Sequence, residues 1–185
     1  MVEPSPLLAL LLHGNQLKRT PRTGWVQRGI QPAEDVAAHS FGVVYATLIL
    51  SRHIDEAFEM DKALAMATLH DLPEGLTTDI PTPAWTLLPP GIKTSVERQA
   101  MVRILGPSAA SEGLVQLWEE LHRNETPEAR LVHDADKLDM YLQATVYACQ
   151  TGNKQLAEFW ERPYTFYYPA AQAVFDELVR LRKKE

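Results

Sequence analysis

A histidine followed directly by an aspartate, His70-Asp71, offers a nitrogen and an oxygen ligand to one divalent cation. Neutral imidazole and carboxylate together suit a borderline transition metal better than calcium. A water molecule coordinated to such a metal has a much lower pKa, so hydroxide forms near neutral pH. Glu74 follows one helical turn after the pair, where its carboxylate can take the proton of that water. These residue types at this spacing indicate metal-dependent hydrolysis.

The dipeptide alone does not identify a metal site, because His133-Asp134 repeats it. A histidine hydrogen-bonded in the core beside a solvated aspartate gives the same two letters. Two further residues favour the metal, since His39 lies upstream of the central pair and Asp136 lies downstream. The four candidates supply two nitrogens and two oxygens and leave coordination positions open for water and substrate: His39, His70, Asp71 and Asp136.

Two predicted helices must carry the first three of these ligands. Residues 61–69 are apolar almost all round, which is typical of a buried helix, and Pro73 prevents this helix from continuing smoothly. The central pair then lies at the inner end of the helix, where polar groups are costly unless something binds them. Residues 32–52 form the other helix, in which His39 lies beside a stripe that repeats every three or four residues: Val36, Ser40, Val43, Thr47 and Leu48.

A third helix carries the last ligand. Thr126-Pro127-Glu128 provides an N-cap, a proline at the first position and an acid in the first turn. Asp136 lies one residue off the predicted buried stripe and Asp139 follows on the same flank, so Asp136 is the expected buried carboxylate. His133-Asp134 falls further round and is expected to be a surface pair. The stripe itself steps by four and three residues: Leu131, Ala135, Leu138, Leu142, Thr145 and Cys149.

The remaining segments are helical in pattern as well. Further helices are predicted after Ser5-Pro6, over 92–105 before Gly106-Pro107, over 109–122 and over 168–182. The proline-rich residues 77–90, which include Trp85, predict a lid or rim. No strand alternation or internal repeat is present. We therefore expect an all-α, compact single-domain helical bundle over residues 1–185, with a motif-bearing core at about 7–160 and a C-terminal helix at about 168–183.

Length and charge restrict the class of function. A chain of 185 residues suits one domain with a real core. The net charge of −6 argues against a nucleic-acid polymer or an anionic membrane as partner, because both require a basic surface. The apolar run at residues 7–12 is too short to span a bilayer, and Glu3 does not fit the basic start of a signal peptide. Cys149 permits no internal disulfide and is expected to be a small core residue, which fits a reducing cytoplasm.

Residues 18–29 form a predicted loop that combines four basic residues with Trp25: Lys18, Arg19, Arg22 and Arg28. Two interpretations stay open. The segment is either a solvated basic loop anchored by one aromatic, or an anion-binding edge with Trp25 as the wall for a planar group. In the second case Arg22 is our choice of phosphate ligand, because a guanidinium can bind two phosphate oxygens at once.

The order of these motifs resembles the HD-domain metal-dependent phosphohydrolases, and more closely their 5′-deoxynucleotidase branch. The resemblance covers roughly residues 7–160, and its motifs are more specific together than the His-Asp pair is alone. It is carried by Pro21-Arg22-Thr23-Gly24-Trp25, Val36-Ala37-Ala38-His39-Ser40, His70-Asp71-Leu72-Pro73-Glu74, Thr78-Asp79-Ile80-Pro81-Thr82-Pro83 and Asp136-Lys137-Leu138-Asp139-Met140.

The resemblance implies an all-α fold, one divalent ion such as cobalt or manganese, and removal of the 5′-phosphate from deoxynucleoside monophosphates. By position, Glu74 and Asp79 match the acidic residues that handle the attacking water. Arg22 and Trp25 match the loop that flanks phosphate and nucleoside. The metal ligands of the family fall on His39, His70, Asp71 and Asp136. Ala38 is a departure, because many relatives have glutamate before the histidine, and its absence removes a possible supporting carboxylate.

Other functions stay open beside this one. A broader nucleotide or sugar-phosphate phosphohydrolase would use the same residues. A metal-stabilised helical binding module without turnover is the alternative from another class, but a structural metal site has no need of Glu74 and Asp79 beside it. The apolar content of the last helices makes a homodimer plausible.

Overall fold

The computed structural model describes residues 4–81, 84, 86–161 and 163–182. Within these ranges the chain forms helices and no β-strand, so the predicted all-α class is confirmed for the described residues. The elements are α1 (Pro6–Gln16), η1 (Leu17–Arg19), α2 (Thr23–Val26), α3 (Val36–Leu50), α4 (Met60–Leu69), α5 (Glu74–Thr77), α7 (Ile92–Leu105), α8 (Ala109–Arg123), α9 (Pro127–Thr151), η2 (Lys154–Trp160) and α10 (Pro169–Arg182).

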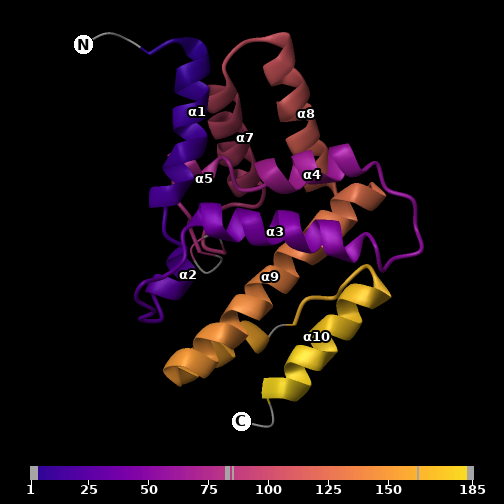
Figure 1. Ribbon diagram of the computed structural model, residues 1–185. Helices are drawn as coiled ribbons and strands as arrows, with labels where there is room; N and C mark the ends of the chain where they lie inside the picture. The colour runs from indigo at the N-terminus through magenta and orange to yellow at the C-terminus, as the bar shows by residue number, and fades with distance from the viewer. Residues whose placement is uncertain (1–3, 82–83, 85, 162, 183–185) are drawn as a thin grey trace.

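Helices α3, α4 and α9 form the centre of the molecule. α3 packs against α4 and α9, and α9 also contacts α4, α8 and α10. Figure 1 shows α9 running diagonally behind α3, with α10 beside one end of it and α1, α7 and α8 together at the opposite end of the molecule. The hydrophobic core lies where the three central helices meet, and its buried members include Val43, Ala63, Met66, Ala67, Leu131, Ala135 and Leu138.

Local sequence sets where these helices begin. Ser5 accepts a hydrogen bond from the backbone N–H of Leu8 and caps α1, and Thr126 caps α9 in the same way, as predicted. Helix α3 begins at Val36 rather than at residue 32. The reason is Asp35, whose side chain accepts from the N–H of Ala38 at 2.8 Å and fixes the start of the helix there.

The central pair lies at a helix end, as the sequence predicts. Helix α4 ends at Leu69 and His70 is its C-cap, after which turns lead into α5 at Glu74. The backbone N–H of Leu72 donates to Leu69 at 3.1 Å, and the N–H of Glu74 donates to Asp71 at 3.0 Å. Pro73, which has no N–H to donate, stands at the junction.

The buried face of α9 turns away from the predicted stripe after Leu138. Tyr141, Ala144 and Tyr147 are buried there, whereas Leu142 is 41% exposed. The cause is η2 and α10, which pack on that flank and bring Trp160 and Phe175 each within 4.7 Å of Tyr141, measured between ring centroids. The core position predicted for Cys149 is wrong, because this side chain is exposed.

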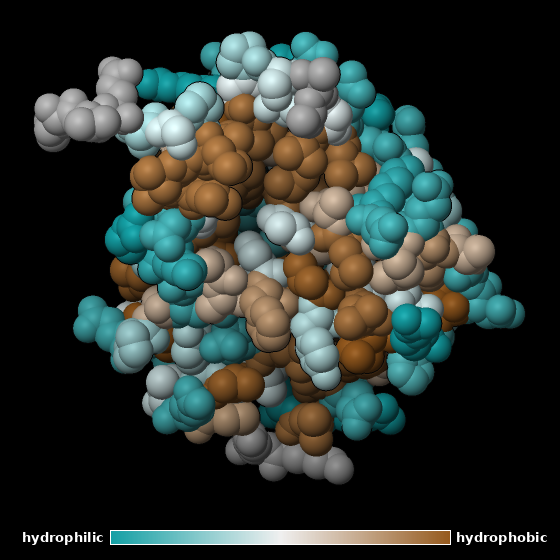
Figure 2. Space-filling view, turned by 45° about the horizontal axis from the view of Figure 1, so that its top comes forward, coloured by the Kyte–Doolittle hydropathy of each residue, from teal (hydrophilic) through white to brown (hydrophobic). Residues whose placement is uncertain are grey.

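Several large apolar side chains face solvent. Four leucines of α1, namely Leu7, Leu8, Leu11 and Leu12, are each about half exposed or more. Phe41 and Tyr45 on α3 are also exposed and stack with their planes 8° apart. Figure 2 shows a broad apolar area near the N-terminal residues, bordered by hydrophilic side chains. Among the described residues, no helix has the length and hydropathy needed to cross a membrane.

Candidate active site

Three of the four predicted metal ligands, His39, His70 and Asp136, converge on one point between α3, α4 and α9, and Asp71 lies beside the two histidines. His39 Nε2 and His70 Nε2 lie 3.3 Å apart. Asp136 Oδ1 is 3.3 Å from His39 Nε2. Asp71 Oδ2 is 3.6 Å from His39 Nε2 and 3.3 Å from His70 Nε2. Three helices thus bring together two nitrogens and two oxygens that lie up to 97 residues apart in the chain.

Each histidine is held by its other ring nitrogen. His70 Nδ1 lies 2.8 Å from the carbonyl oxygen of Ala67, which can only accept, so Nδ1 carries the proton. His39 Nδ1 lies 2.7 Å from the carboxylate of Asp139. Each ring held in this way directs Nε2 to the centre. Two ring nitrogens that face each other beside two carboxylates form a mixed nitrogen and oxygen set, so the donor set fits a divalent transition metal.

Charge inside the centre supports the same conclusion. Burial lowers the pKa of His39, as does Arg22, but the hydrogen bonds to Asp136 and Asp139 outweigh both and raise that pKa to about 9. Burial opposes ionisation of Asp71, yet His70, Arg22 and His39 hold its pKa well below the usual range. The centre therefore favours anionic carboxylates and attracts positive charge.

Glu74 lies beside this centre with one oxygen unused. Its side chain is buried, and Oε2 has no hydrogen-bond partner among the described residues, although Arg22 Nη1 is 3.9 Å away. Burial, followed by repulsion from Asp71 and Asp79, raises the pKa of Glu74 to about 10. A divalent cation at the neighbouring ligands favours the ionised carboxylate, and Oε2 is then free to accept a proton from water.

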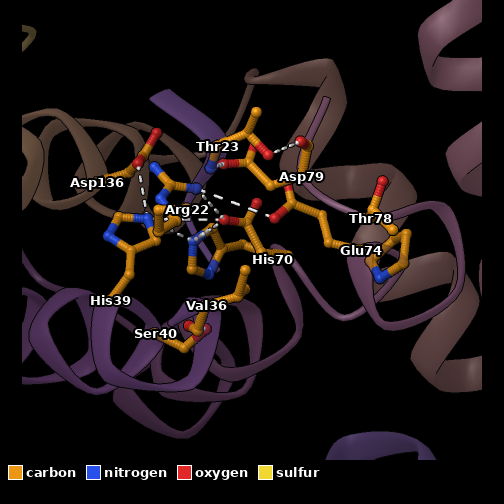
Figure 3. A network of polar contacts seen from close by, with 12 residues as sticks. Arg22, Thr23, Val36, His39, Ser40, His70, Glu74, Thr78, Asp79 and Asp136 are labelled. Carbon is orange, nitrogen blue, oxygen red and sulfur yellow. Dashed lines mark hydrogen bonds and ion pairs between the residues drawn. The ribbon is translucent and has the colours of Figure 1, made fainter. Parts of the chain in front are cut away.

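Arg22 is the basic residue of the loop that points into the centre. Its Nη1 donates to Asp71 Oδ2 at 3.0 Å, and Figure 3 shows the guanidinium among the surrounding acids. Burial lowers the pKa of Arg22, but Asp71, Asp79 and Glu74 raise it above its ordinary value. The guanidinium therefore stays charged.

The other basic side chains of the loop do not join this centre. Lys18 and Arg19 are exposed, and Arg19 donates to Asn15 and Gln16. Arg28 pairs with Glu158 at 2.8 Å. Only part of the predicted basic cluster therefore faces the candidate site.

Asp79 holds the loop in place. Its Oδ2 accepts from the backbone N–H of Thr23 at 2.7 Å, and its carbonyl oxygen accepts from the hydroxyl of Thr23 at 2.5 Å. In Figure 3, Asp79 and Glu74 lie on the same side of Arg22. The carboxylate predicted to handle water thus contacts the loop next to Arg22.

Trp25 lies in the core rather than at the edge of the site. The indole is 2% exposed and packs against Tyr147 and Phe159, with ring centroids 5.5 and 4.5 Å away. Its Nε1 donates to Glu34 at 2.7 Å. The apolar neighbours of this ring bury it, so the structure corrects the expectation of an exposed wall and supports an anchoring aromatic instead. Thr82, Pro83 and Trp85 of the predicted lid lie outside the described residues.

Two residues that contact the proposed ligands were given no role in the sequence analysis. Lys137 Nζ donates to Asp136 Oδ2 at 2.8 Å, and its position directly after the ligand was the available signal. Asp139 contacts His39 from the side opposite the centre. Its place on the same flank of the helix as Asp136 was the signal for that contact.

The second His-Asp pair is not on the surface, so that prediction is wrong. Asp134 is fully buried and accepts the backbone N–H groups of Tyr167 and Tyr168 at 3.0 and 2.9 Å. His133 is partly buried, with Nε2 3.0 Å from the carbonyl oxygen of Leu121. The packing of α8 and of the segment before α10 against α9 removes this pair from solvent.

Comparisons with known proteins agree with this geometry. The family model described as "HD domain" matches residues 14–174. Human 5′-deoxynucleotidase HDDC2 is 35% identical over 143 residues, which cover 76% of this chain and 68% of that protein. The 5′-deoxynucleotidase hdd1 of Schizosaccharomyces pombe is 29% identical over 177 residues, covering 92% of this chain and 87% of the relative.

Solved structures show the same fold. A conserved hypothetical protein from Pyrococcus furiosus superposes with a TM-score of 0.80 at 34% identity, covering 94% of this chain and 99% of that one. The PH0347 protein from Pyrococcus horikoshii OT3 gives a TM-score of 0.76 at 34% identity, covering 96% of this chain and 99% of its own.

Proposed function

This chain belongs to the HD domain family, and we propose that it is a metal-dependent phosphohydrolase that removes the 5′-phosphate from deoxynucleoside monophosphates. The observation that carries the proposal is the buried Oε2 of Glu74, which has no hydrogen-bond partner among the described residues and lies beside the converging nitrogens and oxygens. The relatives named as 5′-deoxynucleotidases support the choice of substrate.

The residues that would hold the ion are His39, His70, Asp71 and Asp136. When bound, a divalent ion supplies Lewis-acid chemistry, because it polarises a phosphate ester and makes a nearby water molecule more acidic. Glu74 is the proposed general base, since its free oxygen can accept the proton that water loses as it attacks phosphorus. The bond from phosphorus to the 5′-oxygen breaks in the same reaction, the proton held by Glu74 passes to that oxygen, and the nucleoside and phosphate leave.

Arg22 is the proposed phosphate ligand. An acidic protein gives an anionic nucleotide no long-range attraction, so the phosphate must be bound at close range. The guanidinium is charged, carries several donors and lies 3.9 Å from Glu74 Oε2. We propose that Asp79 acts through Thr23 to hold this loop, and that Trp25 anchors the loop in the core. Trp25 would then affect substrate binding through the position of Arg22.

We propose cobalt or manganese as the ion, because two imidazoles and two carboxylates form a mixed nitrogen and oxygen set. The test is phosphate release from a panel of ribo- and deoxynucleoside monophosphates and sugar phosphates, after metal is stripped and each divalent ion is returned. We expect the highest kcat/KM with a deoxynucleoside 5′-monophosphate and Co²⁺ or Mn²⁺. Equal rates on sugar phosphates would favour the broader phosphohydrolase instead.

A non-catalytic metal-stabilised module would give a different result in the same experiment. Added metal would raise the unfolding temperature, but no substrate in the panel would release phosphate with any ion. Glu74 argues against this alternative, because a buried carboxylate oxygen without a hydrogen bond costs stability that a purely structural site has no reason to give up.

We further propose a homodimer and a cytoplasmic location. Exposed apolar side chains on the last two long helices support the dimer: Leu142, Val146, Val174 and Leu181. A chain with one cysteine suits a reducing compartment. The molar mass by light scattering, with one chain weighing 20.8 kDa, tests the dimer directly. A nucleotide is the expected small-molecule partner, and the net charge of −6 argues against nucleic-acid polymers and anionic membranes.

A further inference from the structure

We propose that Asp139 is a positioning residue of the metal centre, and that Gly42 provides the space in which its carboxylate reaches His39. The inference rests on the proposed function only to the extent that His39 binds the ion. It adds a residue that acts through a ligand rather than on the ion or on the substrate.

The contact itself is short and sheltered. Asp139 Oδ2 lies 2.7 Å from His39 Nδ1, whereas the oxygens on the other side of the ring lie 3.3 and 3.6 Å from Nε2. His39 is 1% exposed, so water cannot replace the carboxylate at Nδ1. Asp139 therefore holds Nδ1 and orients the ring so that Nε2 faces the other proposed ligands.

Gly42 explains how the carboxylate reaches the ring. It lies in the middle of α3, one turn after His39, where glycine costs roughly 0.5–1 kcal/mol relative to alanine. A Cβ atom at this position would lie 2.0 Å from Asp139 Oδ1 and 2.7 Å from its Cγ. No side chain fits there unless Asp139 moves away from His39. The glycine is thus required by the close approach of α9 to α3.

Neither of the two other positions near His39 supplies this contact. Glu34 comes close enough to form a group with His39 and Asp139, but its Oε1 accepts from Trp25 Nε1 at 2.7 Å. Ala38 precedes the histidine in the sequence and lies on the exposed side of α3, away from the buried ring. The contact at His39 Nδ1 is therefore provided from α9, by Asp139.

The expected consequence is a change in metal affinity. Removal of an outer hydrogen-bond partner of a ligating histidine typically weakens metal binding by roughly 10–100-fold. We expect this loss for Asp139→Ala and for Gly42→Ala, because both separate the carboxylate from the ring. Asp139→Asn keeps an acceptor oxygen without the charge and should lie between Asp139→Ala and the unchanged protein.

The experiment measures the affinity of the metal-stripped protein for Mn²⁺ or Co²⁺ by calorimetry or chelator competition, without substrate. Gly113→Ala is the matched control, because it is also a glycine within a helix and a Cβ there meets nothing within 4 Å. Affinity for the ion should be unchanged in this control. The double variant Gly42→Ala/Asp139→Ala should lose no more affinity than either single variant, since both remove the same contact.

A second measurement separates positioning from folding. The nitrogen shift of His39 Nδ1 should change in Asp139→Ala because the contact with the carboxylate is lost, while the unfolding temperature of the metal-free protein reports any general damage. An unfolding temperature that falls while ion affinity stays unchanged would make Asp139 structural and overturn the proposal. If Gly42→Ala does not fold, the Asp139 variants decide the question alone. No result here depends on phosphate release, so failure of the proposed activity is detected separately.

Discussion

His70-Asp71 and His133-Asp134 are the same dipeptide in two different surroundings. The first lies at the C-terminal end of α4, where a turn frees both side chains to face a common centre. The second lies inside α9, where the helix sends the two side chains to different neighbours: His133 to the Leu121 carbonyl and Asp134 to two backbone N–H groups.

The two pairs differ in the balance of hydrogen-bond donors and acceptors around them. Each carboxylate oxygen of Asp134 accepts a backbone N–H group, so this residue ties α9 to the segment before α10. Around His70 the acceptors outnumber the donors, and two Nε2 atoms face each other. Excess acceptor atoms at a shared point indicate a cation site, whereas the dipeptide itself does not.

The largest expected effect separates the two histidines. His70→Ala removes a proposed metal ligand and should lower bound metal and turnover together, by roughly 10³-fold or more in kcat/KM, a scale on which single electrostatic groups in active sites act. Metal content and phosphate release are measured on the same preparation. If this variant keeps full metal occupancy and normal turnover, His70 is not a metal ligand, and the two His-Asp pairs do not differ in this respect. Asp136→Ala provides a second test of the same centre.

Glu74→Gln tests the role of a single residue beside His70-Asp71. The amide keeps the shape of the side chain but cannot accept a proton, so kcat should fall by roughly 10²-fold or more while metal binding is retained. Single-turnover kinetics at saturating substrate report the chemical step. An unchanged rate would exclude Glu74 as the base and direct attention to Asp79.

The sequence predicts the local surroundings of the proposed ligands well because helix ends and caps are local features. Thr126 and Ser5 cap the helices as expected, and the break near Pro73 frees the central pair as predicted. The place of Asp136 beside the buried stripe also follows from the early part of α9, where the stripe holds up to Leu138.

The predictions that failed depend on contacts between distant segments. Trp25 is buried because Tyr147 and Phe159, more than 120 residues away, close around it. The face of α9 beyond Leu138 is set by η2 and α10, so Tyr141 is buried and Cys149 is not. No local pattern in these segments contains that information.

Asp134→Ala tests the second pair through stability rather than activity. It leaves the N–H groups of Tyr167 and Tyr168, of which the second is buried, without their acceptor, which should lower the free energy of unfolding by about 2 kcal/mol. Asp134→Asn keeps one acceptor and should cost about half as much. Denaturant unfolding of the metal-free variants measures this loss. Turnover per folded molecule should stay unchanged, and a loss of bound metal at full folding would contradict the structural role.

Arg22→Lys changes a residue beside His70-Asp71 and should have a smaller effect on turnover. Lysine keeps the positive charge but loses the planar group that can bind two phosphate oxygens, so kcat/KM should fall by about tenfold while metal content stays normal. The comparison of a deoxynucleotide with a small generic phosphate ester shows whether the loss concerns the phosphate itself. Arg28→Lys is the control from the same loop, because Arg28 pairs with Glu158 instead. If both variants have the same kcat/KM as the unchanged protein on both substrates, the phosphate is bound elsewhere.

His133→Ala should have the smallest effect of all. The ring donates from Nε2 to the carbonyl oxygen of Leu121 at 3.0 Å, but that oxygen also accepts from the backbone N–H of Asn124 at 3.1 Å. Removal of the ring therefore leaves no buried acceptor without a partner, and the free energy of unfolding should fall by about 1 kcal/mol or less. Metal content and kcat/KM should equal those of the unchanged protein. A loss of metal from His133→Ala comparable to that from His70→Ala would mean that the two pairs do not act separately, and that α8 and α9 hold the centre through this contact.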